Sequence, residues 1–280
     1  MNGLAEGIAD AIAYMEAHLD GEMDMEQIAA RAYISPFHFQ RVFNILCGFT
    51  VGEYVRNRRL TLAAQELASS EARVIDVALK YGYDSPDSFA KAFQRFHGIT
   101  PSQAREKDMP LRAFAPMKIK LKLEGGTSME YRIVDKPQFT IVGFLRSFNN
   151  DTSYQEIPKF WQEYMGRPEK DRPICGAYGV CIDSHGKDFD YLIADDYVAY
   201  KDVPEGCVTR VIPAGTWAVF PCRGALPKAL QDVNTRIWSE WLPGCREYAL
   251  GGNYSIEMYT PPKDNPADDY NEIWLPVKKI

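Results

Sequence analysis

The chain has 280 residues, of which 46% are hydrophobic and 25% charged, so it is long enough for two globular domains. No stretch approaches the roughly 18 consecutive apolar residues of a membrane-spanning helix, and no basic segment followed by an apolar one opens the chain. We therefore expect a cytoplasmic protein without a membrane partner. The net charge of −6 predicts weak non-specific binding of nucleic acid, so that any such binding depends on a local basic face.

Helical periodicity extends from the N-terminus to about residue 108. Ile8, Ile12, Met15 and Leu19 recur at spacings of three or four, the stripe of an amphipathic helix. Further helices are expected at about 25–32, 36–46, 50–68, 74–81 and 86–96. We predict an all-α domain at 1–108, a linker with an added strand at 109–128, and a second domain at 129–280.

Residues 35–50 and 85–100 repeat one pattern at an offset of 50 positions. Ser35-Pro36, Phe39, Arg41, Phe43, Gly48 and Thr50 return as Ser85-Pro86, Phe89, Lys91, Phe93, Gly98 and Thr100. In each copy a serine N-cap and a proline open a helix that follows a short helix and a turn. The repeat predicts two helix-turn-helix units in tandem. Two similar outward faces suit a long regular polymer, for which double-stranded DNA is the obvious candidate.

The two repeated helices must bury their apolar faces, which lie at positions i, i+3, i+4 and i+7. Their opposite faces are then expected to present Phe37, Gln40, Arg41 and Asn44 in the first unit, and Asp87, Ser88, Lys91, Gln94 and Arg95 in the second. Amide and guanidinium groups on a projecting helix can hydrogen-bond base edges in the major groove. A merely solvated face is the alternative, which the duplication disfavours.

This part of the chain resembles the DNA-binding domain of the AraC/XylS transcription regulators. The matching residues are Ile28-Ala29, Ser35, His38-Phe39-Gln40-Arg41, Phe43, Gly48, Tyr54-Val55, Arg58 and Ala63, then Val74-Ile75-Asp76-Val77-Ala78, Tyr81-Gly82-Tyr83, Ser85, Phe89, Phe93, Gly98 and Pro101-Ser102. The resemblance implies a monomeric unit whose two recognition helices enter successive major grooves. It implies that Phe37, Gln40 and Arg41 read bases or backbone, with Pro86, Asp87, Ser88 and Lys91 in the equivalent places of the second helix.

The second helix departs from an ideal reader of DNA. Asp87 repels phosphate unless it accepts a hydrogen bond from a cytosine amino group, and Pro86 has no polar group to offer a base. We therefore expect the first helix to supply most of the direct readout and the second mainly to position the protein.

Beyond residue 109 the pattern becomes that of an α+β domain. Prolines at 110 and 116 mark the linker, and residues 118–123 alternate polar and apolar, which predicts the added strand. Helices are expected at about 154–165 and 225–242. The expected strands lie at 131–134, 174–182, 188–194, 208–212, 216–220, 254–259 and 272–277. We predict two pseudo-symmetric βαββ halves around one mostly antiparallel sheet.

Strand-borne carboxylates beside aromatic residues are the candidate ligand site. Alternation places Glu257 with Tyr259 on one strand face, and Glu272 with Trp274 on another. A carboxylate among aromatic rings can hold an organic cation by charge and cation–π attraction. The alternative is a solvated outer face of the sheet. No familiar catalytic motif or cysteine–histidine ligand spacing is present, so we expect no metal or cofactor and read the six cysteines as buried free thiols.

The second half resembles the GyrI-like (gyrase-inhibitor-like) effector-binding domain. The resemblance rests on Met129-Glu130-Tyr131-Arg132-Ile133-Val134, Val142-Gly143, Ile212-Pro213-Ala214-Gly215-Thr216-Trp217-Ala218-Val219-Phe220 and Glu272-Ile273-Trp274-Leu275-Pro276-Val277-Lys278-Lys279. It implies a cleft between two pseudo-twofold halves that binds small hydrophobic, often cationic, ligands. A strand glutamate of the second half is the usual ligand partner, for which Glu257 fits best, with Trp217 and Tyr259 as aromatic lining.

Together these features predict a transcription regulator that binds a DNA operator and senses a small-molecule effector, with RNA polymerase as a further candidate partner. The rival is a small-molecule hydrolase of the GyrI-like type fused to a DNA-binding domain, with Glu257 or Glu272 as general base. Turnover abolished by Glu257→Gln would favour the rival, whereas tight binding of an unchanged ligand would favour the sensor. A vestigial cleft is a third possibility.

Overall fold

The computed structural model describes residues 4–106, 108–117, 128–149, 152–185, 188–199 and 202–280. Their contacts divide the chain into two compact units. The first comprises Met1–Tyr33 and Cys47–Lys122, and the second comprises Ile34–Leu46 and Leu123–Ile280. The domain limits proposed from the sequence stay predictions, but this grouping places one short N-terminal segment with the second unit. The strand predicted at 118–123 lies outside the described residues.

The first unit is helical, as predicted. Its helices are α1 (Leu4–Ala17), α2 (Met25–Arg31), α4 (Val51–Ser69), α5 (Val74–Lys80) and α6 (Pro86–His97), followed by the short 3₁₀ turn η1 (Gln103–Arg105). A capping box opens α4: the Thr50 hydroxyl accepts from the Glu53 amide at 3.1 Å, and the Glu53 carboxylate accepts from the Thr50 amide at 2.9 Å. Buried apolar side chains of α4, α5 and α6 form one cluster that includes Leu60, Phe89 and Phe93.

The second unit begins with α3 (Pro36–Cys47), the first of the two repeated helices. Its apolar stripe is buried at Phe39, Val42 and Phe43, as predicted. The spacing i, i+3, i+4 and i+7 also predicts that Leu46 packs inward; this is wrong, since Leu46, next to the end of the helix, is 44% exposed.

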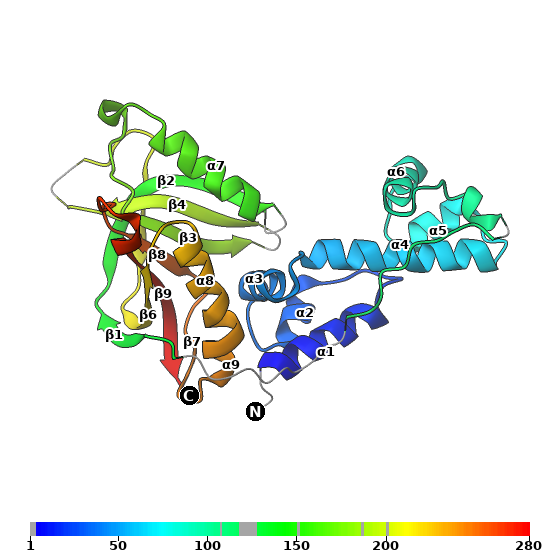
Figure 1. The fold of residues 1–280 in the computed structure, drawn as a ribbon, viewed down its shortest axis with the longest axis horizontal. Helices are drawn as coiled ribbons and strands as arrows, with labels where there is room; N and C mark the ends of the chain where they lie inside the picture. The colour runs from blue at the N-terminus through cyan, green and yellow to red at the C-terminus, as the bar shows by residue number, and fades with distance from the viewer. Residues whose placement is uncertain (1–3, 107, 118–127, 150–151, 186–187, 200–201) are drawn as a thin grey trace. The chain divides into compact units, whose positions relative to one another are not determined.

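A nine-stranded sheet forms the body of the second unit (Figure 1). Its strands are β1 (Arg132–Lys136), β2 (Phe139–Asn149), β3 (Tyr178–His185), β4 (Asp188–Asp196), β5 (Val208–Ile212), β6 (Gly215–Arg223), β7 (Tyr248–Leu250), β8 (Ser255–Tyr259) and β9 (Tyr270–Lys279). They follow the order β1-β6-β9-β8-β3-β4-β2-β5, with β7 on β9, and every pairing between them is antiparallel. The predicted α+β class and antiparallel sheet are confirmed.

The strand order makes the two halves of the sheet equivalent about the β3–β8 pair. Each half contributes strand, strand, helix, strand and strand, and the second half adds the short strand β7. The first strand of each half pairs in the other half: β1 with β6, and β5 with β2. The sequence pattern gives only one strand before the helix of the first half. It misses β2 because the first part of this strand, where Ile141 and Val142 are buried on opposite faces, is an apolar run that lacks a period of two.

The two faces of the sheet carry different cores. On one face, Val142, Phe148, Phe189 and Tyr191 pack with side chains of α7 (Ser153–Met165), which runs along β2 and β4 in Figure 1. The other face holds a cluster that includes Ile141, Val180, Trp217, Ile256 and Trp274. The second helix, α8 (Lys228–Arg236), continues through a π-helical turn η3 (Ile237–Trp241) into α9 (Leu242–Gly244). Within the described ranges, no helix is both long and apolar enough to cross a membrane.

Arg58 forms the main buried polar contact of the first unit. This residue is 6% exposed, and its guanidinium donates two parallel hydrogen bonds of 2.8 Å to the Glu16 carboxylate. Tyr54 adds a third at 2.6 Å. The paired geometry ties α4 to α1 and satisfies charges that burial would otherwise penalise.

Replacement of Arg58 by methionine is expected to lower the free energy of unfolding of the first unit by about 2–3 kcal/mol. This is near the low end of the cost of breaking a buried ion pair, because the Glu16 side chain retains 22% exposure. Urea unfolding followed by far-UV circular dichroism measures the change. The matched control is Arg73→Met, which removes an exposed i,i+3 pair with Asp76 and should leave the transition in place. Equal midpoints for both variants would contradict the structural role of Arg58.

Candidate functional site

A cavity of about 1110 Å³ opens in the second unit, between the helices α7 and α8 and the centre of the sheet. Its walls come from α3, α7 and α8, and its floor from β3, β4 and β8. Most of the lining is apolar, including Phe37, Ile157, Trp161, Phe189 and Leu230. Its size and apolar character suit a drug-sized ligand with several rings.

Glu257 lies at the floor of this cavity because of the register of the central strands. It stands opposite Gly179, where β8 pairs with β3. A side chain at position 179 would collide with the Tyr191 hydroxyl and press on the Glu257 carboxylate. A glycine at this position therefore leaves the space in which the tyrosine and the carboxylate meet.

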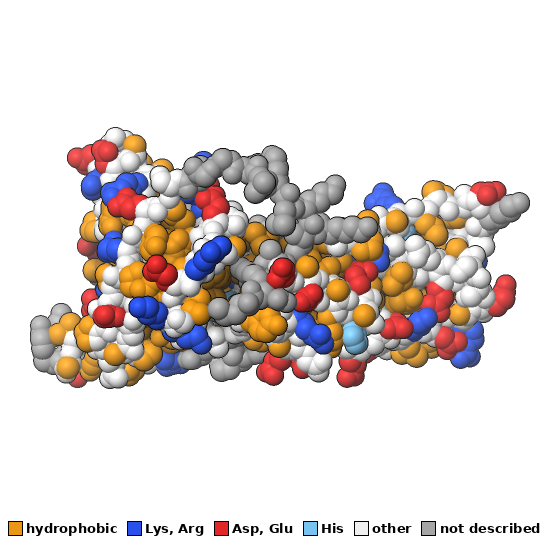
Figure 2. All heavy atoms as spheres, turned by 90° about the horizontal axis from the view of Figure 1, so that it is seen from below, with side chains coloured by type: hydrophobic (Ala, Val, Ile, Leu, Met, Phe, Trp, Pro, Cys, Tyr) orange, Lys and Arg blue, Asp and Glu red, His pale blue; other side chains and the backbone are white. Residues whose placement is uncertain are grey.

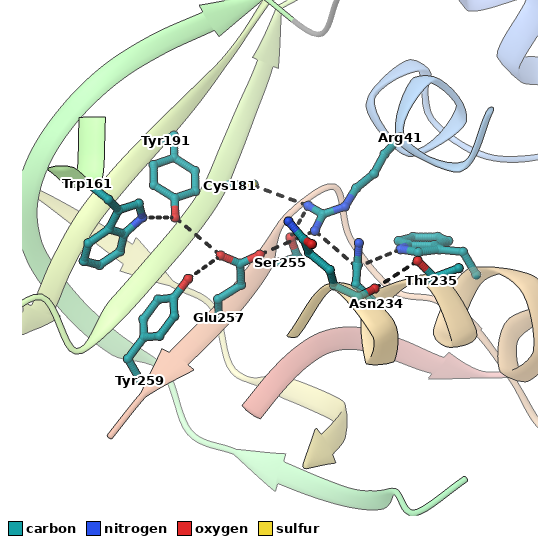
Figure 3. Close-up of polar contacts among 11 residues, drawn as sticks. Arg41, Trp161, Cys181, Tyr191, Asn234, Thr235, Ser255, Glu257 and Tyr259 are labelled. Carbon is teal, nitrogen blue, oxygen red and sulfur yellow. Dashed lines mark hydrogen bonds and ion pairs between the residues drawn. The ribbon is translucent and has the colours of Figure 1, made fainter. Parts of the chain in front are cut away.

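Two tyrosines hold one oxygen of the Glu257 carboxylate (Figure 3). The Tyr259 hydroxyl donates to Oε2 at 2.8 Å, and the Tyr191 hydroxyl donates to the same atom at 3.4 Å. Trp161 of α7 in turn donates from its indole Nε1 to the Tyr191 oxygen at 2.8 Å. Burial, with the nearby carboxylate as a further cause, raises the pKa of both tyrosines well above 10, so that they stay protonated donors.

Arg41 of α3 reaches the other carboxylate oxygen. Its Nη2 lies 3.7 Å from Oε1 of Glu257, and both side chains are 15% exposed. The same nitrogen donates to Oδ1 of Asn234 on α8 at 3.2 Å, and Nη1 donates to the Ser255 hydroxyl at 3.3 Å (Figure 3). The guanidinium is therefore surrounded by acceptors from α8 and β8.

Two neighbours of Arg41 anchor α3 in the second unit. Phe37 is 2% exposed, and its ring meets Phe189 edge-on at a centroid distance of 5.3 Å. His38 is buried, with Nε2 2.9 Å from the Gly252 carbonyl oxygen. Burial, reinforced by the charge of Arg41, lowers the pKa of His38 from its usual 6.5 to about 4, so the imidazole is neutral at pH 7.

The residues predicted to face DNA differ in exposure between the two repeated helices. In α6, Asp87, Ser88, Lys91 and Arg95 are all exposed. In α3, Phe37 and Gln40 are buried, whereas Arg41 and Asn44 are partly exposed. The prediction of an outward position is thus wrong for Phe37 and Gln40, because the face opposite the apolar stripe of α3 packs on the second unit. Their roles in reading DNA stay predictions.

Five residues were singled out as ligand partners, and the structure brings two of them, Glu257 and Tyr259, to the cavity. It does not bring Trp217, Glu272 and Trp274 there. Because β8 and β9 pair with Met258 opposite Glu272 and Ile256 opposite Trp274, the last two lie on the other face of the sheet. Trp217 is fully buried in the cluster on that same face.

Glu272 instead forms a closed polar network. Its carboxylate accepts from Arg132 and the Trp274 indole at 2.6 Å each, and from the Tyr270 hydroxyl at 2.5 Å. Burial alone would raise the pKa of Glu272, but these donors together hold it below its usual value. The group is therefore an ionised carboxylate already saturated by protein donors.

The predicted elements contain further cavity residues that sequence reasoning did not single out. Trp161 lies in the helix expected at 154–165, Tyr191 in the strand expected at 188–194, and Asn234 in the helix expected at 225–242. An aromatic residue on the predicted amphipathic helix was the available signal for Trp161. Nothing in the sequence pattern marks Tyr191 or Asn234.

The charges of the cavity favour a positive ligand. Its acidic lining residues are Glu169, Glu257 and Asp269, and its basic ones are Arg41 and Arg172, so the net charge is −1. An acidic, aromatic-lined cavity can hold an organic cation by ion pairing and ring contacts. Among the described residues, no group of three or more histidine, cysteine or acidic side chains could hold a metal ion.

A helical DNA-binding unit together with a ligand cavity in an antiparallel α+β domain defines a ligand-sensing transcription regulator. The family described as integron-associated effector binding protein matches residues 132–277, and the family described as helix-turn-helix domain matches residues 28–107. The chain belongs to the integron-associated effector binding protein family and carries an AraC-type helix-turn-helix domain before that region. Both sequence resemblances are thereby confirmed.

Relatives cover either the whole chain or one part of it. The right origin-binding protein of Escherichia coli (strain K12) is 24% identical over 97% of this chain and 98% of its own length. The HTH-type transcriptional activator AarP of Providencia stuartii is 41% identical over 36% of this chain and 75% of its own. The structure of SAV2435 bound to tetraphenylphosphonium covers 54% of this chain and 94% of its own, with 23% identity and a TM-score of 0.45.

The buried His38 predicts a loss of stability in acid. Between pH 6.5 and about pH 4, the His38 imidazole is mostly protonated in the unfolded chain and mostly neutral in the folded protein. The contribution of the neutral His38 to the free energy of unfolding is therefore present above pH 6.5 and is lost as the pH falls toward 4. Between pH 7 and pH 5 it amounts to about 2 kcal/mol.

The test is urea unfolding at the two pH values, followed by tryptophan fluorescence, because all five tryptophans belong to the second unit. His38→Gln should flatten the pH dependence, whereas the control His18→Gln, in the first unit, should not. Burial lowers the pKa of His97 as well, but this residue lies in the first unit, which contains no tryptophan. An unchanged slope in His38→Gln would contradict the assignment.

Proposed function

We propose that this regulator binds its operator through the repeated helices and senses a hydrophobic organic cation in the cavity of the second unit. The observation that carries the proposal is the Glu257 carboxylate at the floor of a largely apolar cavity. Its Oε2 accepts hydrogen bonds from two tyrosines, and its Oε1 is directed to the guanidinium of Arg41. Control of RNA polymerase and action in the cytoplasm belong to the same proposal.

The chemistry of the site supports a cation over an anion or a neutral ligand. Oε2 of Glu257 is already paired with neutral donors, so Oε1 remains the position where a positive charge gains most. Trp161 and Tyr259, whose rings meet edge-on at 5.1 Å, place aromatic surface beside it. Such rings attract cations by about 0.5–2 kcal/mol each, more when water is excluded.

Tetraphenylphosphonium is a suitable probe because it is a large aromatic cation that cannot donate hydrogen bonds. We expect the full chain to bind it and Glu257→Gln to bind it at least about tenfold more weakly, since the substitution keeps the shape of the side chain and removes only its charge. Isothermal titration calorimetry measures both affinities.

Two controls sharpen this measurement. Glu163→Gln makes the same change on α7 at a 57% exposed side chain that is no part of the cavity lining, and should leave the affinity unchanged. Triphenylphosphine oxide, a neutral relative of the probe, should not distinguish Glu257→Gln from the parent. Equal affinity of parent and Glu257→Gln for the cation would refute the proposed site. We further propose that the ligand leaves unaltered, which mass spectrometry of a cationic ester probe after incubation checks.

For DNA, we propose that α3 supplies most direct readout and that α6 mainly positions the protein. Gln40→Ala should lower the discrimination between an operator and its single-base variants by about 1–3 kcal/mol at one position. Lys91→Ala should weaken binding to all of them alike and reduce the dependence on salt. On the face shown in Figure 2, acidic and basic side chains are interspersed, in keeping with recognition by specific contacts. Fluorescence anisotropy with duplexes selected from a random library provides the test, and equal loss of base discrimination in both variants would overturn this division of roles.

A further inference from the structure

Helix α3 belongs to two functional assemblies at once. It lies within the helix-turn-helix region matched at residues 28–107 and carries the residues that we propose to read DNA. Its residues 34–46 nevertheless group by contacts with the second unit. Phe37, Gln40 and Arg41 all line the cavity, together with Glu257. The side chains proposed to read DNA are therefore part of the wall of the effector site.

Arg41 occupies the position in which the cavity would bind a positive charge. Its Nη2 faces Oε1 of Glu257, the oxygen that the tyrosines leave open. Asn234 and Ser255 also accept from the guanidinium, at 3.2 Å and 3.3 Å, and the Cys181 sulfur lies 3.6 Å from Nη1. Figure 3 shows Arg41 reaching from α3 toward the carboxylate, on the side away from Tyr191 and Tyr259.

The charge of the cavity depends on this arginine. With Arg41 in place, the lining carries two basic and three acidic side chains, a net charge of −1; without it, the net charge is −2. An entering cation would face the guanidinium at close range, and like charges in a partly buried site repel each other. The cation and Arg41 therefore cannot both gain the full attraction of Glu257.

We propose that Arg41 is a built-in competitor of the effector: it holds α3 against Glu257 in the absence of ligand, and a cationic effector displaces it and frees α3 to bind DNA. This inference rests on the proposed function of the cavity. The form with Arg41 on Glu257 is then unable to read DNA through α3, because Phe37 and Gln40 are buried in it. The effector binds the released form better and shifts the population toward it.

Thermodynamic linkage makes the effect reciprocal. If the effector raises the affinity for DNA by some factor, DNA must raise the affinity for the effector by the same factor. Couplings of this kind usually amount to about 5–150-fold. The regulator is accordingly one whose DNA binding is increased, not abolished, by its ligand.

The first experiment breaks the contact from the cavity side and leaves α3 unaltered. The affinity of full-length Glu257→Gln for a fluorescein-labelled duplex, selected by the parent protein from a random library, is measured by anisotropy without any ligand. We expect it to rise by about tenfold, because the competent fraction rises. The matched control Glu163→Gln should equal the parent. The proposal would be overturned if Glu257→Gln bound DNA no better than the parent while its unfolding transition, followed by tryptophan fluorescence, stayed intact.

If Glu257→Gln fails to fold, Asn234→Ala takes its place, since it removes another acceptor of Arg41 and should also strengthen DNA binding. A second experiment uses tetraphenylphosphonium. The probe should raise the affinity of the parent for the duplex by about tenfold, and Arg41→Met should bind the probe about tenfold more tightly than the parent does. Arg146→Met, which removes an arginine that is no part of the cavity lining, is the control for the latter.

The two experiments separate the possible failures. A probe that binds the parent but leaves its affinity for DNA unchanged overturns the competition while the proposed function stands. A probe that does not bind at all refutes the proposed cavity function and, with it, displacement by a cation. The measurement on Glu257→Gln without ligand still decides whether the Arg41 contact restrains α3.

Discussion

The antiparallel pairing of β3 with β8 is the constraint on which the rest of the second unit depends. It joins the two halves of the sheet at their centre and places Gly179 opposite Glu257. Its register determines that Glu257 and Tyr259 point toward α7 and α8, while Ile256 and Met258 join the opposite core. A slip by one residue would exchange these two sets, since neighbouring side chains of a strand point to opposite faces. The cavity is thus a product of strand register before it is a product of any particular side chain.

Much of the fold could be read from the sequence, because it depends on short-range patterns. The Ser-Pro caps, the duplicated apolar stripe and the period-two strands are local, and the helices α1 to α6 and most strands form where these patterns predict them. The strand β2 and the exclusion of Glu272 from the cavity were not predictable in this way. The first requires knowing that both faces are covered, and the second requires the register between β8 and β9. Alternation within one strand assigns residues to a common face but does not say which face of the sheet that is.

Helix α3 shows the same limit for a helix. Its apolar stripe identifies the side that must be buried, but not whether the opposite side is free. The aromatic ring of Phe37 and the amide of Gln40 are as compatible with an interior position as with a DNA-facing one, and here they are interior. The distinction rests on contacts between residues more than 140 positions apart, such as those of Arg41 with Asn234, Ser255 and Glu257. Two of the five residues predicted for the ligand site, Glu257 and Tyr259, line the cavity because their strand happens to present that face inward.

The exchange of outer strands between the halves has a mechanical consequence. Because β1 adds to the half that contains α8, and β5 to the half that contains α7, neither half can separate from the other without breaking a full strand pairing. The backbone hydrogen bonds of the β1–β6 and β2–β5 pairings therefore hold together, on both sides, the sheet that lies beneath α7 and α8. A bulky guest between α7 and α8 cannot gain room by splitting the sheet, so the strain of its entry must be relieved in the helical walls, of which α3 is held to β4 and β8 by contacts of its side chains.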